Sequence, residues 1–103
     1  MSYWVTQLDG SDEDTPGMDA FGPLYDELVN ATEEEPDVTV THESGWSLSV
    51  GPRRRASLEN VEDRPPRPRH LEGVDRQRFI ELASALAEGG LATVEAEPWW
   101  PGY

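Results

Sequence analysis

Three closely spaced stretches of alternating apolar and polar residues constrain the fold more than any other feature of the sequence. In residues 46–50, Trp, Leu and Val alternate with two serines, so one side of the stretch is apolar and the other carries hydroxyl groups. Residues 38–42 and the weaker stretch at residues 56–61 alternate in the same way, and turn residues lie between them at Ser44-Gly45 and at residues 51–53. Short turns join antiparallel neighbours, so a three-stranded meander with one buried face is predicted.

A helix is predicted before this meander. Phe21, Leu24 and Leu28 recur at intervals of three and four residues, which is the spacing of one helix face. A proline inside a helix removes a hydrogen bond, whereas the first turn tolerates it. We therefore expect the helix to begin at residues 20–23, with Pro23 in its first turn.

A second helix is predicted after the meander. Asp75 is a good N-cap residue, and Val74 and Phe79 have the spacing of a hydrophobic staple. Gly89-Gly90 supplies a stop. The helix is therefore expected between these signals.

The remaining segments complete the predicted order. Residues 3–8 alternate and predict a first strand, and residues 91–96 predict a last one. Residues 9–17 are polar and residues 62–73 are rich in Pro and Arg, so we expect loops there. The order β-α-β-β-β-α-β predicts one α+β domain over residues 1–103, with two helices on one face of a mostly antiparallel sheet. The expected core consists of Phe21, Leu24, Leu28, Trp46, Leu48, Val50, Phe79, Leu82 and Leu86.

The negative charge is concentrated in the first half of the chain. Residues 1–52 contain twelve Asp or Glu and no Arg or Lys, whereas residues 53–103 contain nine acids and eight Arg. The net charge of −13 opposes binding to nucleic acid or to an anionic membrane, because phosphates are bound by basic surfaces. It favours a basic protein partner, whose association such a field would accelerate. The alternative is an acidic surface that serves solubility or adaptation to a salty cytoplasm.

Two acidic clusters and the aromatic tail are the candidate partner-binding elements. The first cluster lies in the loop expected before the first helix, and the second follows that helix, where acids oppose the helix dipole. The aromatic residues of the tail either fold back as a lid over the core or anchor an interface, because Trp and Tyr are frequent in binding hot spots. The residues concerned are Asp12, Glu13, Asp14, Glu33, Glu34, Glu35, Trp99, Trp100 and Tyr103.

No pattern in the sequence predicts a catalytic residue, a metal site or a cofactor. The chain has no Cys, which excludes thiolate chemistry and favours a reducing compartment. His42 and His70 are far apart and lack the spacing of metal ligands. Neither a signal peptide nor a run of about 20 apolar residues is recognisable. We therefore expect a cytoplasmic protein that is not an enzyme and binds no metal, cofactor or membrane.

The predicted elements stand in a fixed order: a helix at residues 21–29, the meander at residues 38–61, a helix at residues 75–88, Gly89-Gly90, and a strand that ends in Trp99-Trp100. This arrangement resembles that of immunity proteins of bacterial polymorphic toxin systems. Those are small, acidic, Cys-poor α+β proteins that neutralise a toxin by binding to it. The resemblance implies a non-enzymatic immunity or inhibitor protein that docks on a basic partner. It includes no motif and therefore assigns no functional residue.

Two other classes of function stay open. An acidic decoy that mimics the phosphates of DNA would need its acids in regular rows on one exposed surface. A small ligand-binding domain or enzyme would need a concave pocket with convergent polar groups.

Overall fold

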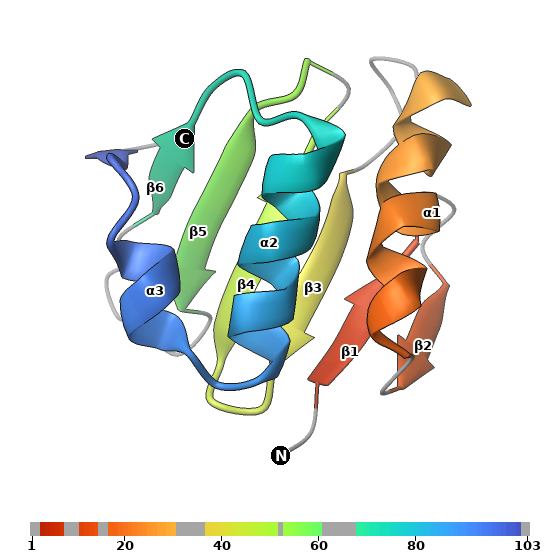
Figure 1. The fold of residues 1–103 in the computed structure, drawn as a ribbon, viewed down its shortest axis with the longest axis horizontal. Coiled ribbons are helices and arrows are strands. Elements are labelled where there is room, and N and C mark those ends of the chain that lie inside the picture. Colours follow the sequence, from red (N-terminus) through yellow and green to blue (C-terminus); the bar gives the residue numbers. More distant parts are fainter. Residues whose placement is uncertain are drawn as a thin grey trace.

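One antiparallel sheet organises the fold of the chain (Figure 1). The computed structural model describes residues 3–7, 11–14, 17–30, 37–51, 53–60 and 68–101, and for residues 18, 29 and 30 it describes the backbone alone. Within these ranges seven strands pair in the order β2-β1-β3-β4-β5-β6-β7. The strands are β1 Tyr3–Thr6, β2 Asp12–Asp14, β3 Val38–His42, β4 Trp46–Val50, β5 Ala56–Asn60, β6 Arg69–Leu71 and β7 Trp100–Pro101.

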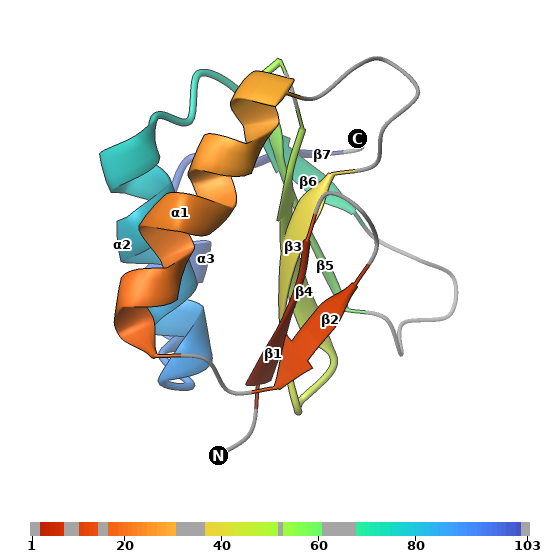
Figure 2. The same ribbon diagram turned by 90° about the vertical axis from the view of Figure 1, so that its right-hand side faces the viewer.

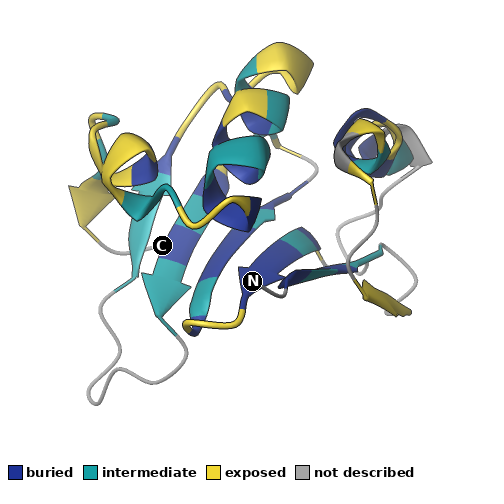
Figure 3. Ribbon diagram, turned by 60° about the horizontal axis from the view of Figure 1, so that its bottom comes forward, coloured by how far each residue is buried: buried dark blue, intermediate teal, exposed yellow. Residues whose placement is uncertain are grey.

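The helices of the described residues all lie on one side of this sheet (Figure 2). They are α1 Phe21–Asp26, α2 Arg76–Ala87 and α3 Leu91–Glu95, and the 3-10 turns η1 Met18–Ala20 and η2 Glu27–Asn30 extend α1 at both ends. The predicted fold class, an α+β fold with helices on one face of an antiparallel sheet, is confirmed. The buried positions of α1, α2 and the central strands face one another, as the colours of Figure 3 show.

The predicted meander is confirmed as β3, β4 and β5. Val40 pairs with Leu48, which pairs with Leu58, and the three side chains are fully buried under the helices. Gly45 adopts a φ of 97° between β3 and β4, a conformation that glycine adopts without strain. The expected core residues are buried, except that Trp46 is half-buried beneath Arg69, whose guanidinium lies 5.4 Å from the ring centroid.

Both predicted helices begin where their sequence signals indicated. Pro23 is the third residue of α1, so its missing N–H falls in the first turn. The Asp75 side chain accepts a hydrogen bond of 2.8 Å from the Arg78 N–H and caps α2. Gly89, with a φ of 81°, follows the end of α2.

Two loops of the sequence prediction contain strands, and both predictions are corrected. Asp12–Asp14 forms β2, because its backbone pairs with β1 although acidic residues disfavour strands. Arg69–Leu71 forms β6, which pairs with β5 and places Leu71 in the core. Residues 9–10, 15–16 and 62–67 of these predicted loops lie outside the described residues, as do residues 8 and 61 of the predicted strands beside them.

The strand expected at residues 91–96 is wrong. Leu91–Glu95 is the short helix α3, and Val94 within it is fully buried. Leu91, three residues earlier, packs against the same core. Thr93 and Val94 favour a strand locally, but packing of this segment against α2 decides its structure. The last strand is instead β7, which pairs with β6.

Candidate functional site

The face of the sheet opposite the helices carries a continuous row of polar residues. Directly opposed residues on neighbouring strands share a face, because side chains alternate with a period of two. The register therefore defines one row that crosses every strand of the sheet. In spatial order it contains Asp12, Thr6, Thr39, Ser49, Ser57, His70 and Trp100, which we call the first row.

The first row is accessible along its whole length. None of its seven side chains is buried, whereas the residues next to them on the central strands point toward the helices and are buried. Val40 and Leu48, which flank Thr39 and Ser49 along the chain, are 0% exposed. The first row is therefore polar and partly or fully exposed, whereas the helix-covered face is apolar and buried.

A second row runs beside the first across five strands. It contains Asp14, Trp4, Thr41, Ser47 and Glu59. Thr41 and Ser47 are buried in its centre, and Trp4 is half-buried. Together, the seven residues of the first row and the five of the second include three carboxylates and no Arg.

The hydroxyl groups of the two rows are hydrogen-bonded across the strands. The Thr39 and Ser49 hydroxyls lie 3.1 Å apart, and those of Thr41 and Ser47 lie 3.2 Å apart. The Thr6 hydroxyl donates a bond of 2.7 Å to a carboxylate oxygen of Asp12. These contacts hold the side chains in fixed positions on the face.

The first acidic cluster of the sequence prediction forms the edge strand β2. Asp12 and Asp14 belong to the helix-free face, and Glu13, opposite Val5, belongs to the helix-covered side. All three side chains are exposed, and none of them forms an ion pair with another described residue. The strand is therefore a line of uncompensated negative charge at one edge of the sheet.

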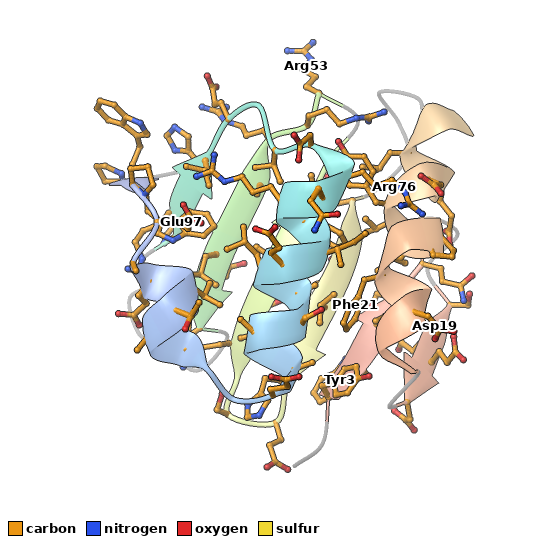
Figure 4. The ribbon with its side chains drawn as sticks, viewed as in Figure 1. Tyr3, Asp19, Phe21, Arg53, Arg76 and Glu97 are labelled. Atoms are coloured by element: carbon orange, nitrogen blue, oxygen red, sulfur yellow. The ribbon has the colours of Figure 1, made fainter. Side chains whose placement is uncertain are left out.

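Asp19 adds negative charge near β2 and Tyr3. Burial raises the pKa of the Tyr3 phenol, and the charges of Asp19 and Glu13 raise it further. Figure 4 shows Asp19 beside α1, above Tyr3. The negative potential therefore reaches from β2 to the start of α1.

The arginines of the described residues lie away from β2, and four of them form ion pairs. Figure 4 shows Arg53 at the opposite end from Tyr3, and Arg76 between the start of α2 and α1. Surface ion pairs of this kind add little stability, but they cancel charge locally. The pairs are Arg55–Glu72, Arg69–Glu95, Arg76–Asp26 and Arg78–Glu97.

The two Trp residues of the tail have different surroundings. The Trp99 indole N–H donates a bond of 2.7 Å to the Val94 carbonyl, and the half-buried ring packs against the core. Trp100 is 65% exposed and is the large hydrophobic residue that the described part of the chain leaves in solvent. Trp99 thus packs against the core, whereas the ring of Trp100 is exposed to solvent. The remaining candidates, Glu33, Glu34, Glu35 and Tyr103, lie outside the described residues.

An open pocket of about 500 Å³ lies beside Trp100. Its charged groups are already engaged, because Arg78 pairs with Glu97, and Glu72 pairs with Arg55. The pocket therefore offers little charge to a ligand. It is lined by His70, Leu71, Glu72, Arg78, Pro98 and Trp100.

The two histidines lie apart. His42 is buried, its Nδ1 accepts a bond of 3.1 Å from the Ser44 N–H, and its Nε2 has no hydrogen-bond partner among the described residues. His70 lies in the first row. The described residues contain no group of three or more His, Asp or Glu that could hold a metal ion, and none of their helices is long and apolar enough to cross a membrane.

The register brings together residues that the sequence prediction treated separately. Asp12 and Trp100, proposed from two different segments, are the two ends of the first row. The hydroxyl residues between them were not candidates, although their alternation with buried residues in the meander was visible in the sequence. The chain matches no protein-family model, no curated protein and no solved structure.

Proposed function

We propose that the chain is a non-enzymatic binding protein that docks on a basic partner protein and acts as an immunity or inhibitor protein. The observation that carries the proposal is the edge strand β2, in which Asp12, Glu13 and Asp14 are all exposed and without ion pairs among the described residues. Acids at such positions do not stabilise the fold, because like charges side by side repel. They attract a basic surface and accelerate its association.

The competing explanation for the three acids of β2 is that they protect an unpaired edge of the sheet. Charged residues on an edge strand oppose pairing with a strand of another molecule. Protection of the edge against such pairing requires charge on β2, but it does not require that a partner protein bind there. The two explanations therefore differ in the salt dependence of partner association.

The two other classes of function have less support. A DNA-mimicking decoy needs acids in regular rows, and the described rows carry acids at β2 and at Glu59 with hydroxyls between them. An enzyme or ligand-binding domain needs convergent polar groups, and Glu72 and Arg78 of the described pocket are each paired with a residue outside it.

The experiment compares two variants that change the charge equally. One carries Asp12→Asn, Glu13→Gln and Asp14→Asn, and each amide keeps the size of its acid. The matched control carries Glu43→Gln, Glu81→Gln and Glu88→Gln, three exposed acids outside β2. The partner is captured from the native host, identified by mass spectrometry and purified, and its association is measured at low and at high salt.

The β2 variant should associate about tenfold more slowly at low salt and show a weaker salt dependence, because it loses the local field that steers the partner. The control should differ little from the parent. The β2 variant should unfold at the same or a slightly higher denaturant concentration. Equal association rates for both variants would leave the acids of β2 as protection of the sheet edge, and the proposal would fail.

A further inference from the structure

We propose that the first and second rows together form the docking surface, and that its occupant is an arginine- or lysine-rich segment of the partner. The inference rests on the proposed function and assigns it a place. It moves the site from the acidic edge to the whole helix-free face. The surface consists of Asp12, Thr6, Thr39, Ser49, Ser57, His70 and Trp100 of the first row and Asp14, Trp4 and Glu59 of the second, whose central residues Thr41 and Ser47 are buried.

The surface is continuous and long enough for a peptide segment. The first row crosses six inter-strand spacings of about 4.8 Å each, which gives a length of about 29 Å. Extended chain rises about 3.3 Å per residue, so about nine residues fit along the row. The middle of the row consists of Ser and Thr, whose small side chains let a partner backbone approach the sheet.

The chemistry of the surface suits a guanidinium or ammonium group. The carboxylates of Asp12 and Asp14, which form no ion pair with a described residue, are suited to charge-assisted hydrogen bonds, and hydroxyl oxygens are suited to further ones. The half-buried Trp4 and the exposed Trp100 offer indole rings near the two ends of the surface. All three kinds of group bind cations.

The chain already uses the same type of contact internally. The guanidinium of Arg54 lies 5.1 Å from the ring centroid of Tyr25, and that of Arg69 lies 5.4 Å from the ring centroid of Trp46. Trp100 has no such cation from the described residues. A partner Arg or Lys on its exposed ring would complete the pattern.

Charge opposes a second copy of the chain, a nucleic acid or an anionic lipid as the occupant. A second copy of the chain carries the same net charge of −13 and would bring like charges together. Nucleic acids and anionic lipids carry phosphates, which the three carboxylates of the rows repel. A cationic segment is the occupant whose charge complements this face.

The test uses a nona-arginine peptide as the probe and a nona-glutamate peptide as its control. Each is titrated into the ¹⁵N-labelled full chain, and amide shifts are mapped by NMR. Nona-arginine should shift Thr39, Ser49 and Ser57 on the central strands and the indole N–H of Trp100. The surface helix positions, such as Thr93 on α3, should stay unchanged, and nona-glutamate should shift none of them.

Paired substitutions test the charge at the centre of the surface. Ser57→Arg should weaken binding of nona-arginine about fivefold, and Ser57→Asp should strengthen it about threefold. Thr93→Arg and Thr93→Asp, at an exposed position of α3, change the net charge equally and should have much smaller effects. If Ser57→Arg fails to fold, the Ser57→Asp variant decides the question.

The outcomes separate the two proposals. If nona-arginine does not bind, this inference fails, and the association rates of the β2 variant decide the proposed function separately. If it binds but shifts only residues outside the two rows, this inference fails and the proposed function stands. Shifts of the rows by a neutral hexasaccharide of glucose, with none by nona-arginine, would assign the face to a carbohydrate and overturn the inference.

Discussion

The Tyr25 hydroxyl donates a buried hydrogen bond of 2.7 Å to the carbonyl oxygen of Val74. The bond joins α1 to the segment that starts α2, and the Tyr25 ring lies 5.7 Å from the ring of Phe79 in α2. Arg54, in the turn between β4 and β5, covers the same ring. Its carbonyl also accepts a bond of 2.9 Å from the Val74 N–H. Tyr25 thus connects α1 with α2 and with the turn between β4 and β5.

Tyr25→Phe should destabilise the fold by about 1–3 kcal/mol, because the buried Val74 carbonyl loses its donor while the ring is kept. Urea unfolding followed by circular dichroism measures the change. Tyr25→Leu removes the ring contacts as well and should cost more than Tyr25→Phe. Equal stability of Tyr25→Phe and the parent would mean that the bond contributes nothing to the fold.

The stability of the chain should fall as the pH rises above about 10. Burial raises the pKa of Tyr25, although the neighbouring Arg54 lowers it, and burial also raises the pKa of Tyr3. Above pH 10 the unfolded chain therefore loses these phenolic protons before the folded chain does, and the folded state binds more protons. Urea unfolding at pH 9, 10 and 11 measures the slope, which should be shallower in Tyr25→Phe.

Asp75→Ala should destabilise the fold by about 1 kcal/mol, because the Arg78 N–H in the first turn of α2 loses its acceptor. Asp75→Asn keeps a side-chain oxygen at the same position and serves as the control. Thermal or urea unfolding should place it close to the parent. A loss as large in Asp75→Asn as in Asp75→Ala would contradict the role of Asp75 as the cap.

Trp99→Ala and Trp100→Ala should behave differently although the residues are adjacent. Trp99→Ala removes a ring that packs against the core and a bond to Val94, and should cost about 2 kcal/mol. Trp100→Ala removes an exposed ring and should cost less than about 0.5 kcal/mol. Chemical unfolding of both variants checks the difference. Equal losses would show that the lid involves both residues.

Gly22→Ala should change stability by less than about 1 kcal/mol, because two effects oppose each other. A Cβ at Gly22 would overlap the guanidinium of Arg76, which must then move away from Asp26. The exposed ion pair contributes little, and alanine favours the helix over glycine. Arg76→Ala, which removes the pair without a new Cβ, is the control. A loss above about 2 kcal/mol in Gly22→Ala would indicate that α1 and α2 cannot adjust.

The elements in which apolar residues recur at regular spacing were predictable from the sequence, and the elements without such a pattern were not. The alternation of β4 and the N-cap Asp75 of α2 are local signals that agree with the packing. Strand β2 contains only acids, so its sequence opposes the structure that pairing with β1 imposes. Helix α3 has five residues, too few for a periodic pattern to distinguish it from a strand.

The candidate site was predictable only in parts. The acids and the Trp residues were visible as clusters along the chain, but Asp12 and Trp100 share a row only through six strand pairings. A shift of one residue in any pairing moves a strand's side chains to the other face. Register is therefore the information that the sequence lacked. The Ser and Thr of the rows appeared simply as the polar side of each strand.

The two edge strands of the sheet, β2 and β7, differ in sequence, but both disfavour pairing with strands of other molecules. An exposed edge strand is a template on which strands of other molecules can assemble. Strand β2 is three residues long and entirely acidic, and β7 is two residues long and contains Pro101, which has no N–H to donate. Neither edge offers a usable template, so copies of the chain should resist fibre formation even at high concentration.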